Sequence, residues 1–579
     1  MIAAITVALL LASGGARPNI VVVLADDQGW GDLGINGNPA ARTPRLDNLA
    51  RQGARFDRFF VQPVCAPTRA EFLTGRWHPR GGVHGVSTGA ERLDLDERTI
   101  ADMLSGAGYA TGCFGKWHNG SQYPYHPLGR GFGEYYGYTS GHWGDYFSPP
   151  LDHNGRLVRG RGFLTDDITN QAMSFIGDNA RAKKPFFCFL ALNTPHSPMQ
   201  VPDPYWNRFK DADLPPAGVP NADLMHARAA LAMGENIDDN MGRMLDKLAE
   251  LKIERDTIVA YFSDNGPNGP RFNGGMRGIK GTTDEGGTRS PLVIRWPGRI
   301  PPGGVVKPIA GAVDLLPTLA SLAGVVPEAS KPPDGINLAP WVLGGDAPAP
   351  DRILFAHWGG RTSARGQTRR LDAQGRLYDM ENDPGQKTDI AEREPAIRKR
   401  LADAVAAWRS TVLAETPLVD NRPFPVGHKE LPRAFLPARD GVPHGGIRRS
   451  APAPNCSYFT RWTKPSDRMT WSVGVANAGR FEAIVHYACP KEDIGSEIRL
   501  SLGGAQWKGV VSEAHDPPAR GAENDRVPRK GESLVKDFKP MSLGEAFLPA
   551  GMGTLELSSP RVGGGQVAEI RALELVMKP

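Results

Sequence analysis

Four short apolar runs, rich in β-branched and aromatic residues, constrain the fold of this chain most strongly. They span residues 19–25, 185–192, 256–262 and 291–296, and turn residues or helix-like stretches bound them. Continuous apolar runs of this length are typical of parallel strands that are buried on both faces. Residues 228–251, just before the third run, carry apolar side chains at helical spacing. This alternation of helix and strand predicts an α/β sheet.

The length of the chain predicts more than one domain. It has 579 residues, whereas a single hydrophobic core serves roughly 250–300 residues. After residue 350, strand-like runs and a helix over 391–413 indicate a small α+β subdomain. A segment rich in Pro, Arg and Gly follows as a linker, and alternating short segments beyond it predict an all-β sandwich. The predicted division is 1–16 signal peptide, 17–350 α/β domain, 351–415 C-terminal subdomain, 416–450 linker and 451–579 β-sandwich.

The N-terminus predicts export. Residues 1–12 are an apolar run too short to span a bilayer, and small residues follow at 13–16, which is typical of a signal peptide. A basic n-region is missing, and a wrongly assigned start codon is the alternative. We expect a periplasmic or secreted protein without stable membrane insertion, since no later segment reaches ~18 apolar residues. The net charge of +5 includes no basic block, so we expect no nucleic-acid partner.

Five cysteines lie at positions 65, 113, 188, 456 and 489 without the CxxC spacing of zinc sites. Cys456 and Cys489 share the C-terminal segment, so a disulfide between them is open in an oxidising compartment. Cys113 and Cys188 fall in strand-like apolar runs, where buried free thiols are common. Cys65 is left over.

The neighbours of Cys65 give it a chemical role. The segment Cys65-Ala-Pro-Thr-Arg69, which continues to Thr74-Gly75, resembles the signature of the type I sulfatases, of the alkaline phosphatase superfamily. The resemblance implies that a formylglycine-generating or an anaerobic maturation enzyme converts Cys65 to 3-oxoalanine, or formylglycine. The hydrated aldehyde offers one oxygen to attack sulfur and a second to expel sulfate, whereas a serine would stay trapped as its ester. A helix after Pro67 would bring Arg69 onto the face of residue 65.

Acidic and amide side chains follow two of the predicted strands. Asp26 and Asp27 end the first strand, and Asp264 and Asn265 end a later one. Taken alone, such pairs are more often helix caps or turns. Here they resemble the family motifs Asp-Asp-x-Gly-x-Gly-Asp and Ser-Asp-Asn-Gly, which imply a metal site. Their hard oxygen ligands favour Ca²⁺ over zinc. The predicted metal ligands are Asp26, Asp27, Cys65, Asp264 and Asn265.

Three further motifs resemble catalytic segments of the family. In Gly115-Lys116-Trp117-His118, the resemblance implies that the Lys holds the nucleophile and the His serves as its base. His196, in Thr194-Pro195-His196, would protonate the leaving alcohol, Lys280 would grip sulfate, and Arg289 would give structural support. The predicted catalytic residues are Cys65, Arg69, Lys116, His118, His196 and Lys280.

The resemblance covers roughly residues 18–415. It implies a mixed, mostly parallel sheet flanked by helices, as in alkaline phosphatase, and the hydrolysis of sulfate esters. Because every motif lies before Pro291, we expect the C-terminal region to be dispensable for the hydrolysis of a small aryl sulfate. Its residues Trp462, Trp471 and Trp507 resemble carbohydrate-binding β-modules, although a lid or a dimerising module is equally consistent.

A sulfated carbohydrate is the expected substrate. Residues 135–147 mix aromatic side chains with His and Asp, which suits sugar rings and hydroxyls, although a buried aromatic cluster is the alternative. The predicted substrate-binding residues are His142, Trp143, Asp145, Arg271 and His357, with His153, Asn154, Asn273 and Trp358 as further choices.

Two other functions stay open at this point. A phosphonate or phosphate monoester hydrolase of the same superfamily would use the same nucleophile and metal. A non-catalytic sulfated-glycan-binding protein would use the scaffold alone and would have no need of formylglycine.

Overall fold

The computed structural model describes residues 17–214, 223–326, 331–416 and 420–579. The predicted signal peptide, residues 1–16, lies outside this part of the chain. No helix among the described residues is long and apolar enough to cross a membrane.

A ten-stranded sheet forms the centre of the molecule, in the order β12-β2-β11-β9-β1-β8-β4-β5-β6-β7. Strands β9, β1, β8, β4 and β5 pair in parallel, whereas β11, β6 and β7 run antiparallel to their neighbours. The predicted α/β class with a mixed, mostly parallel sheet is therefore confirmed. The strands are β1 (Asn19–Ala25), β2 (Ala54–Phe56), β4 (Ala110–Lys116), β5 (Glu134–Tyr138), β6 (Pro150–His153), β7 (Arg156–Arg159), β8 (Phe186–Ala191), β9 (Thr257–Ser263), β11 (Leu292–Arg295) and β12 (Gly304–Val306).

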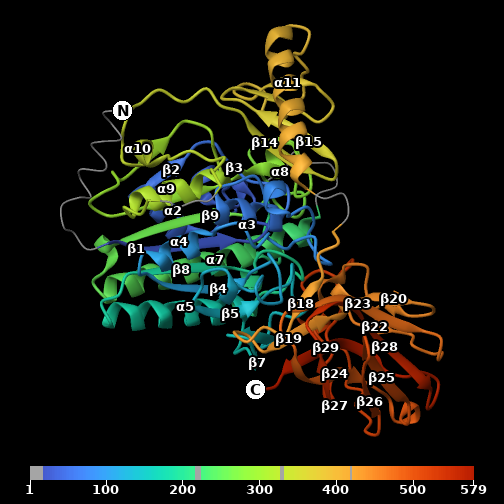
Figure 1. Ribbon diagram of the computed structural model, residues 1–579. Helices are drawn as coiled ribbons and strands as arrows, with labels where there is room; N and C mark the ends of the chain where they lie inside the picture. Colours follow the sequence, from blue (N-terminus) through green and yellow to red (C-terminus); the bar gives the residue numbers. More distant parts are fainter. Residues whose placement is uncertain (1–16, 215–222, 327–330, 417–419) are drawn as a thin grey trace.

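Helices cover both faces of this sheet, as Figure 1 shows. Strand β1 is buried along its whole length. Ile20, Val22 and Leu24 pack into one core, and Val21 and Val23 pack into the other. This explains why the strand has no polar face. One face carries α3 (Cys65–Thr74), α4 (Ile100–Gly106), α9 (Leu315–Leu322) and α10 (Ala339–Val342), and the other carries α2 (Pro44–Gln52), α5 (Leu164–Arg181) and α7 (Leu224–Glu250).

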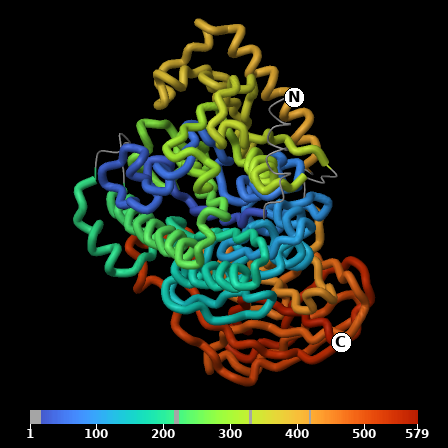
Figure 2. Tube along the Cα trace, turned by 90° about the vertical axis from the view of Figure 1, so that its left-hand side faces the viewer, coloured from blue at the N-terminus to red at the C-terminus, as the bar shows by residue number. Residues whose placement is uncertain are grey.

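Smaller elements complete the N-terminal two thirds of the chain. A four-stranded antiparallel sheet packs against a long helix on the side of the molecule away from the C-terminal strands (Figures 1 and 2). These elements are β14 (Leu354–Trp358), β15 (Arg361–Arg365), β16 (Arg369–Leu371), β17 (Leu377–Asp379) and α11 (Pro395–Thr411). The remaining short elements are β3 (Phe59–Phe60), β10 (Arg289–Ser290), β13 (Ala310–Gly311), α6 (Asp203–Phe209) and α8 (Glu285–Thr288).

The C-terminal region is a sandwich of two sheets around a shared apolar core. The first sheet has β18 (Phe424–Val426), β20 (Val442–His444), β23 (Arg468–Val475), β25 (Glu497–Leu502), β26 (Ala505–Val510) and β28 (Gly551–Arg561). The second has β19 (Arg433–Pro437), β21 (Arg448–Arg449), β22 (Phe459–Thr460), β24 (Gly479–Ala488), β27 (Lys539–Leu548) and β29 (Glu569–Met577).

The prediction of a linker over 416–450 is wrong for most of that segment. Strands β18, β19, β20 and β21 lie within it and pair with β23, β29 and β22 of the sandwich. Proline cannot donate a backbone hydrogen bond, so it favours strands with one free edge. Pro425, Pro437 and Pro443 lie in such short outer strands, which is why a proline-rich stretch still forms sheet. The other domain boundaries drawn from the sequence stay a prediction.

Two expectations about C-terminal side chains also change. Trp462, Trp471 and Trp507 are all buried in the sandwich core, so they offer no exposed face to a sugar ring. The disulfide left open between Cys456 and Cys489 is absent, because all five cysteines are free.

Candidate active site

The acidic motifs meet at one edge of the central sheet. Strands β1 and β9 are parallel neighbours in which Ala25 pairs with Ser263. The residues that follow, Asp26 and Asp27 on one side and Asp264 and Asn265 on the other, therefore leave the sheet together. All four side chains are buried. Asn265 Nδ2 donates to Asp27 Oδ1 at 2.8 Å, and the backbone N–H of Asp27 donates to Asp264 Oδ1 at 3.1 Å.

Cys65 is the first residue of helix α3, which therefore begins before Pro67 and not after it as the sequence predicted. The helix is buried along its whole length, and Cys65 is only 3% exposed. One turn later, Arg69 donates from Nε and Nη2 to Asp264 Oδ2 at 3.1 and 2.8 Å. Both partners of this ion pair are fully buried. The pair therefore docks the start of α3 against the end of β9.

Two lysines complete a balanced set of charges. Lys116, at the end of β4, lies 2.7 Å from Asp26, and Lys280 lies 2.6 Å from Asp27. Burial alone would lower the pKa of Lys280, but Asp27 and the other anionic groups outweigh it and raise that pKa. Burial, reinforced by Asp26, raises the pKa of Asp264 to about 6. Each carboxylate thus has its own cation, and the third pair is the one that Arg69 makes.

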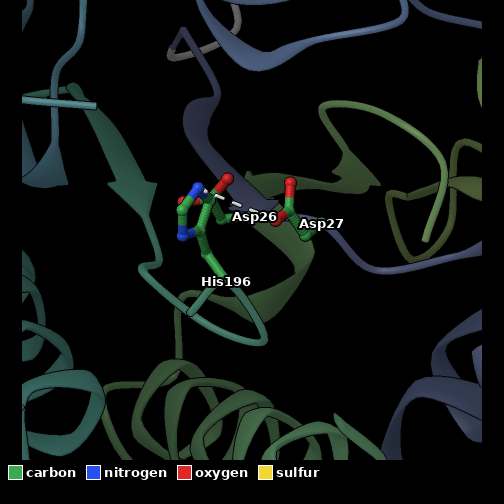
Figure 3. A group of neighbouring side chains, drawn as sticks. All are labelled: Asp26, Asp27 and His196. Atoms are coloured by element: carbon green, nitrogen blue, oxygen red, sulfur yellow. Dashed lines mark ion pairs between the residues drawn. The ribbon is translucent and has the colours of Figure 1, made fainter. Parts of the chain in front are cut away.

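The site also contains oxygen atoms without protein partners. Asp26 Oδ1 and Asn265 Oδ1 are buried and accept no hydrogen bond within the described part of the chain. Ligand atoms of Asp26, Cys65 and Asp264 lie within 4.8 Å of one another, as do those of Asp26, Asp27 and His196 (Figure 3). Buried carboxylate and amide oxygens without partners are the donors that a hard divalent cation needs. The residues present therefore fit a calcium ion.

Asp27 and His118 adopt a backbone conformation that is rare outside glycine. Their φ angles are 69° and 67°, in the left-handed region that costs about 1–3 kcal/mol for such residues and is often found at active sites. His118 Nε2 lies 2.8 Å from the carbonyl of Val86, while Nδ1 is buried without a partner among the described residues. A carbonyl only accepts, so Nε2 carries the proton and Nδ1 offers a lone pair. Burial, together with Lys116, holds the pKa of His118 well below its ordinary value.

His196 faces Asp27 across the site. It follows β8 in the 194–198 loop, its Nδ1 lies 2.7 Å from the carbonyl of Ser197, and its Nε2 lies 3.7 Å from Asp27 Oδ2 (Figure 3). The ring of His142 stacks on it at 5.8 Å. Burial and Lys280 lower the pKa of His196 to about 4, against the opposing effect of Asp27.

The predicted substrate-binding residues divide into two groups. His142 adjoins His196, and its neighbour Trp143 stacks on Tyr138 with ring centroids 5.3 Å apart. The other three make their contacts elsewhere.

Asp145 pairs with Arg520 of the sandwich at 3.1 Å. Arg271 pairs with Asp32 at 2.7 Å and donates to the carbonyl of Asp27 at 2.9 Å. It therefore holds the loop that bears the predicted metal ligands.

His357 lies on β14, against Trp408 and Thr362. The further choices are His153, which packs on Tyr136; Asn154, which accepts from Tyr135 N; Asn273, which donates to Gly286 O; and Trp358, at the end of β14. Arg289 pairs with Glu285 at 3.6 Å, in keeping with a supporting role.

Sequence reasoning assigned no role to several polar groups near this site. The hydroxyl of Tyr138 and Nδ2 of Asn193 are buried without hydrogen-bond partners among the described residues. Tyr138 ends β5 and Asn193 follows β8. This position at the end of a central strand was the sequence signal that could have identified them. Asn455 and Glu532 of the sandwich contact His142 and Ser197, and no local pattern pointed to them.

Comparisons with known proteins decide the family. The family model described as Sulfatase matches residues 18–325, which is more than half of the chain. This chain belongs to the sulfatase family. The sulfatase is therefore a sulfuric ester hydrolase, with the predicted motifs gathered at one edge of its central sheet.

Curated relatives and solved structures agree with this assignment. The sulfatase is 34% identical over 385 residues to N-acetylgalactosamine-6-sulfatase of Canis lupus familiaris, which covers 60% of this chain and 70% of the relative. It is 35% identical over 387 residues to arylsulfatase A of Homo sapiens, covering 60% of this chain and 72% of the relative. The crystal structure of Ps i-CgsB in complex with k-i-k-neocarrahexaose matches with a TM-score of 0.62 and 29% identity, over 68% of this chain and 93% of that one.

Proposed function

We propose that this sulfatase removes sulfate from a sulfated saccharide, with a formylglycine made from Cys65 as its nucleophile and a bound calcium ion. One observation carries the proposal. Three buried carboxylates, two buried cations, a third cation that is 22% exposed and an amide oxygen surround a buried cysteine at the start of a helix. A structural thiol has no use for such a concentration of charge, whereas attack on an anionic ester does.

Calcium would be held by Asp26, Asp27, Asp264 and Asn265, beside residue 65. Support comes from the unpartnered oxygens of Asp26 and Asn265 and from the absence of a cysteine or histidine cluster of zinc type among these residues. When bound, the ion would supply Lewis-acid polarisation of a sulfate oxygen and favour the ionised form of the nucleophile.

The side chains of this chain would bind and orient the reacting groups. Lys280 would grip sulfate, which leaves Lys116 and Arg69 to hold residue 65 at the N-terminus of α3, where the helix dipole favours negative charge. His118 would accept a proton at Nδ1 from the hydrated aldehyde, since that atom has a free lone pair. His196 would donate a proton to the departing alcohol.

A formylglycine at residue 65 would supply two hydroxyl groups on one carbon, one to attack sulfur and the other to expel sulfate afterwards. The residues of this chain would serve both stages, with Lys116 and Arg69 holding residue 65, His118 taking up a proton at Nδ1 and His196 giving a proton to the alcohol that departs.

A saccharide is the substrate class that we favour. N-acetylgalactosamine-6-sulfatase is a relative at 34% identity, and Ps i-CgsB is a structural neighbour in complex with a neocarrahexaose. His142 stacks beside His196, and an imidazole, with a flat ring and polar nitrogens, suits the mixed polar and apolar faces of a sugar. Export to the periplasm or beyond, and a maturation enzyme as partner, complete the proposal.

The deciding experiment compares esters on matured protein. The protein, co-expressed with a formylglycine-generating enzyme, should release sulfate from a sulfated sugar and from nitrophenyl sulfate, with a much higher kcat/KM than for nitrophenyl phosphate. The Cys65→Ser and Cys65→Ala variants should lose nearly all turnover, and the Cys113→Ser variant, which changes another buried cysteine, is the control. A preference for the phosphate ester would favour a phosphonate or phosphate monoester hydrolase instead.

A further inference from the structure

A long loop of the sandwich enters the catalytic part of the molecule. It connects β26 to β27, and its residue Val527 is buried in the core that the central sheet shares with α5 and α7. The backbone N–H of Arg526 donates to the carbonyl of Met199 at 2.8 Å. Asp525 forms an isolated antiparallel bridge with Gln200. This loop thus packs directly on the segment that follows His196.

Gln200 links the segment that follows His196 to Tyr146 in the catalytic part and to the loop of the sandwich. It is fully buried; its Oε1 accepts from the backbone N–H of Tyr146 at 2.7 Å, and its Nε2 donates to Gly521 O and to Asp525 Oδ1, both at 2.8 Å. A buried amide with all these bonds made has one stable orientation, because breaking any of them leaves an unsatisfied group. The backbone beyond His196 is therefore fixed by the sandwich.

Glu532 of the same loop reaches the residue next to His196. Ser197 donates its hydroxyl hydrogen bond to Glu532 Oε1, while the carbonyl of Ser197 accepts from His196 Nδ1 at 2.7 Å and from the Tyr146 hydroxyl at 3.0 Å. Ser197 is therefore held at two points, by Glu532 at its hydroxyl group and by His196 and Tyr146 at its carbonyl. The carbonyl in turn engages Nδ1 of His196 and so leaves Nε2 as the ring nitrogen that faces the site.

A second contact from the sandwich reaches His142. Asn455 Nδ2 lies 3.3 Å from His142 Nδ1, and Cys456 Sγ donates to the carbonyl of His142 at 3.1 Å. A Cβ at Gly141 would lie 2.7 Å from Asn455 Nδ2 and 2.5 Å from His118 Nε2. Glycine is therefore required at position 141. Asn455 packs tightly against the loop that carries His142, close to His118.

We propose that the sandwich forms one wall of the active site and that Glu532 is a positioning residue, which holds His196 on the leaving-group side through Ser197. The inference rests on the proposed function, because it needs His196 to protonate the departing alcohol. It goes beyond the family match, which ends at residue 325. It also argues against the expectation that the C-terminal region is dispensable for a small aryl sulfate.

The test is a comparison of leaving groups. A sugar alkoxide needs a proton to depart, whereas a nitrophenolate does not, so a mispositioned His196 should affect the sugar ester selectively. The Glu532→Ala variant should lose about tenfold or more in kcat/KM on a sulfated sugar and less than about threefold on nitrophenyl sulfate. The Glu532→Gln variant keeps an acceptor for the Ser197 hydroxyl and should recover most of the loss.

A matched control lies elsewhere in the sandwich. Glu482 on β24 also accepts from a serine hydroxyl, that of Ser542, at 2.7 Å. The Glu482→Ala variant should leave both substrates unchanged, and thermal melts of all variants should show that they fold.

The inference is overturned if Glu532→Ala behaves like Glu482→Ala, or if it loses activity equally on both esters. If instead the unaltered matured protein releases sulfate from neither ester, the proposed function itself is wrong.

Discussion

The buried pair of Arg69 and Asp264 offers a quantitative test of the site's electrostatics. Both side chains are fully buried, and two hydrogen bonds of 2.8 and 3.1 Å join them. The Asp264→Asn variant keeps the shape and one acceptor but leaves the guanidinium without its counter-charge. Removing one partner of a buried ion pair destabilises by about 3–5 kcal/mol, because the remaining charge stays out of water.

A double variant separates the cost of the uncompensated Arg69 charge from the simple loss of its hydrogen bonds to Asp264. In the double variant Arg69→Met/Asp264→Asn, the uncompensated charge is gone, so the free energy of unfolding should fall less than in Asp264→Asn alone. The control is Asp178→Asn on α5, which breaks a pair with Arg181 whose side chains are 62% and 71% exposed. That variant should lose at most about 1 kcal/mol.

Urea unfolding in the presence of a chelator measures these differences without a contribution from bound metal. Because the pKa of Asp264 is raised to about 6 by burial and Asp26, the measurements belong at a pH well above that value, where the carboxyl group is ionised. A loss below about 1 kcal/mol for Asp264→Asn, or a double variant that loses the sum of both single variants, would refute the reasoning.

The same geometry makes four further predictions. Chelation should inactivate the protein and calcium should restore it, whereas Asn265→Ala should need a much higher calcium concentration; restoration by zinc alone would contradict the assignment. Deletion of residues 420–579 should abolish hydrolysis even of nitrophenyl sulfate, since it removes Val527 from the core of the central sheet and Asn455 from the His142 loop beside His118; full activity of the shortened chain would contradict this. His196→Ala should lower kcat/KM on a sulfated sugar by about 10²- to 10⁴-fold and spare nitrophenyl sulfate. Equal losses on the two esters for His196→Ala would remove its role as the acid. His118→Ala, in contrast, should impair the hydrolysis of both esters, because both depend on proton transfer at residue 65.

Local sequence patterns were sufficient for the central sheet. The apolar run at 19–25 coincides with β1, because a strand buried on both faces leaves a continuous apolar signal. The same logic brought Asp26 and Asp264 together, since parallel neighbours end at the same edge. The helix expected after Pro67 is present, although it already begins at Cys65.

Contacts between distant segments were beyond such patterns. Ser197 and Glu532 are separated by 335 positions, and nothing near either residue records that they meet. The partner of Asp145 is Arg520 of the sandwich, and that of Arg271 is Asp32. Each of these side chains is polar and close to the site, so composition alone suggested a substrate contact. Only the packing of the chain shows that another side chain already neutralises each charge.

The measurement that tests the central claim most directly is the mass of the peptide that contains residue 65. Protein co-expressed with a formylglycine-generating enzyme should carry an aldehyde at this position, in a fraction that rises and falls with the kcat for sulfate release. Reduction of that aldehyde with borohydride should abolish turnover. Full sulfatase activity in protein whose Cys65 is an unmodified thiol would contradict the account.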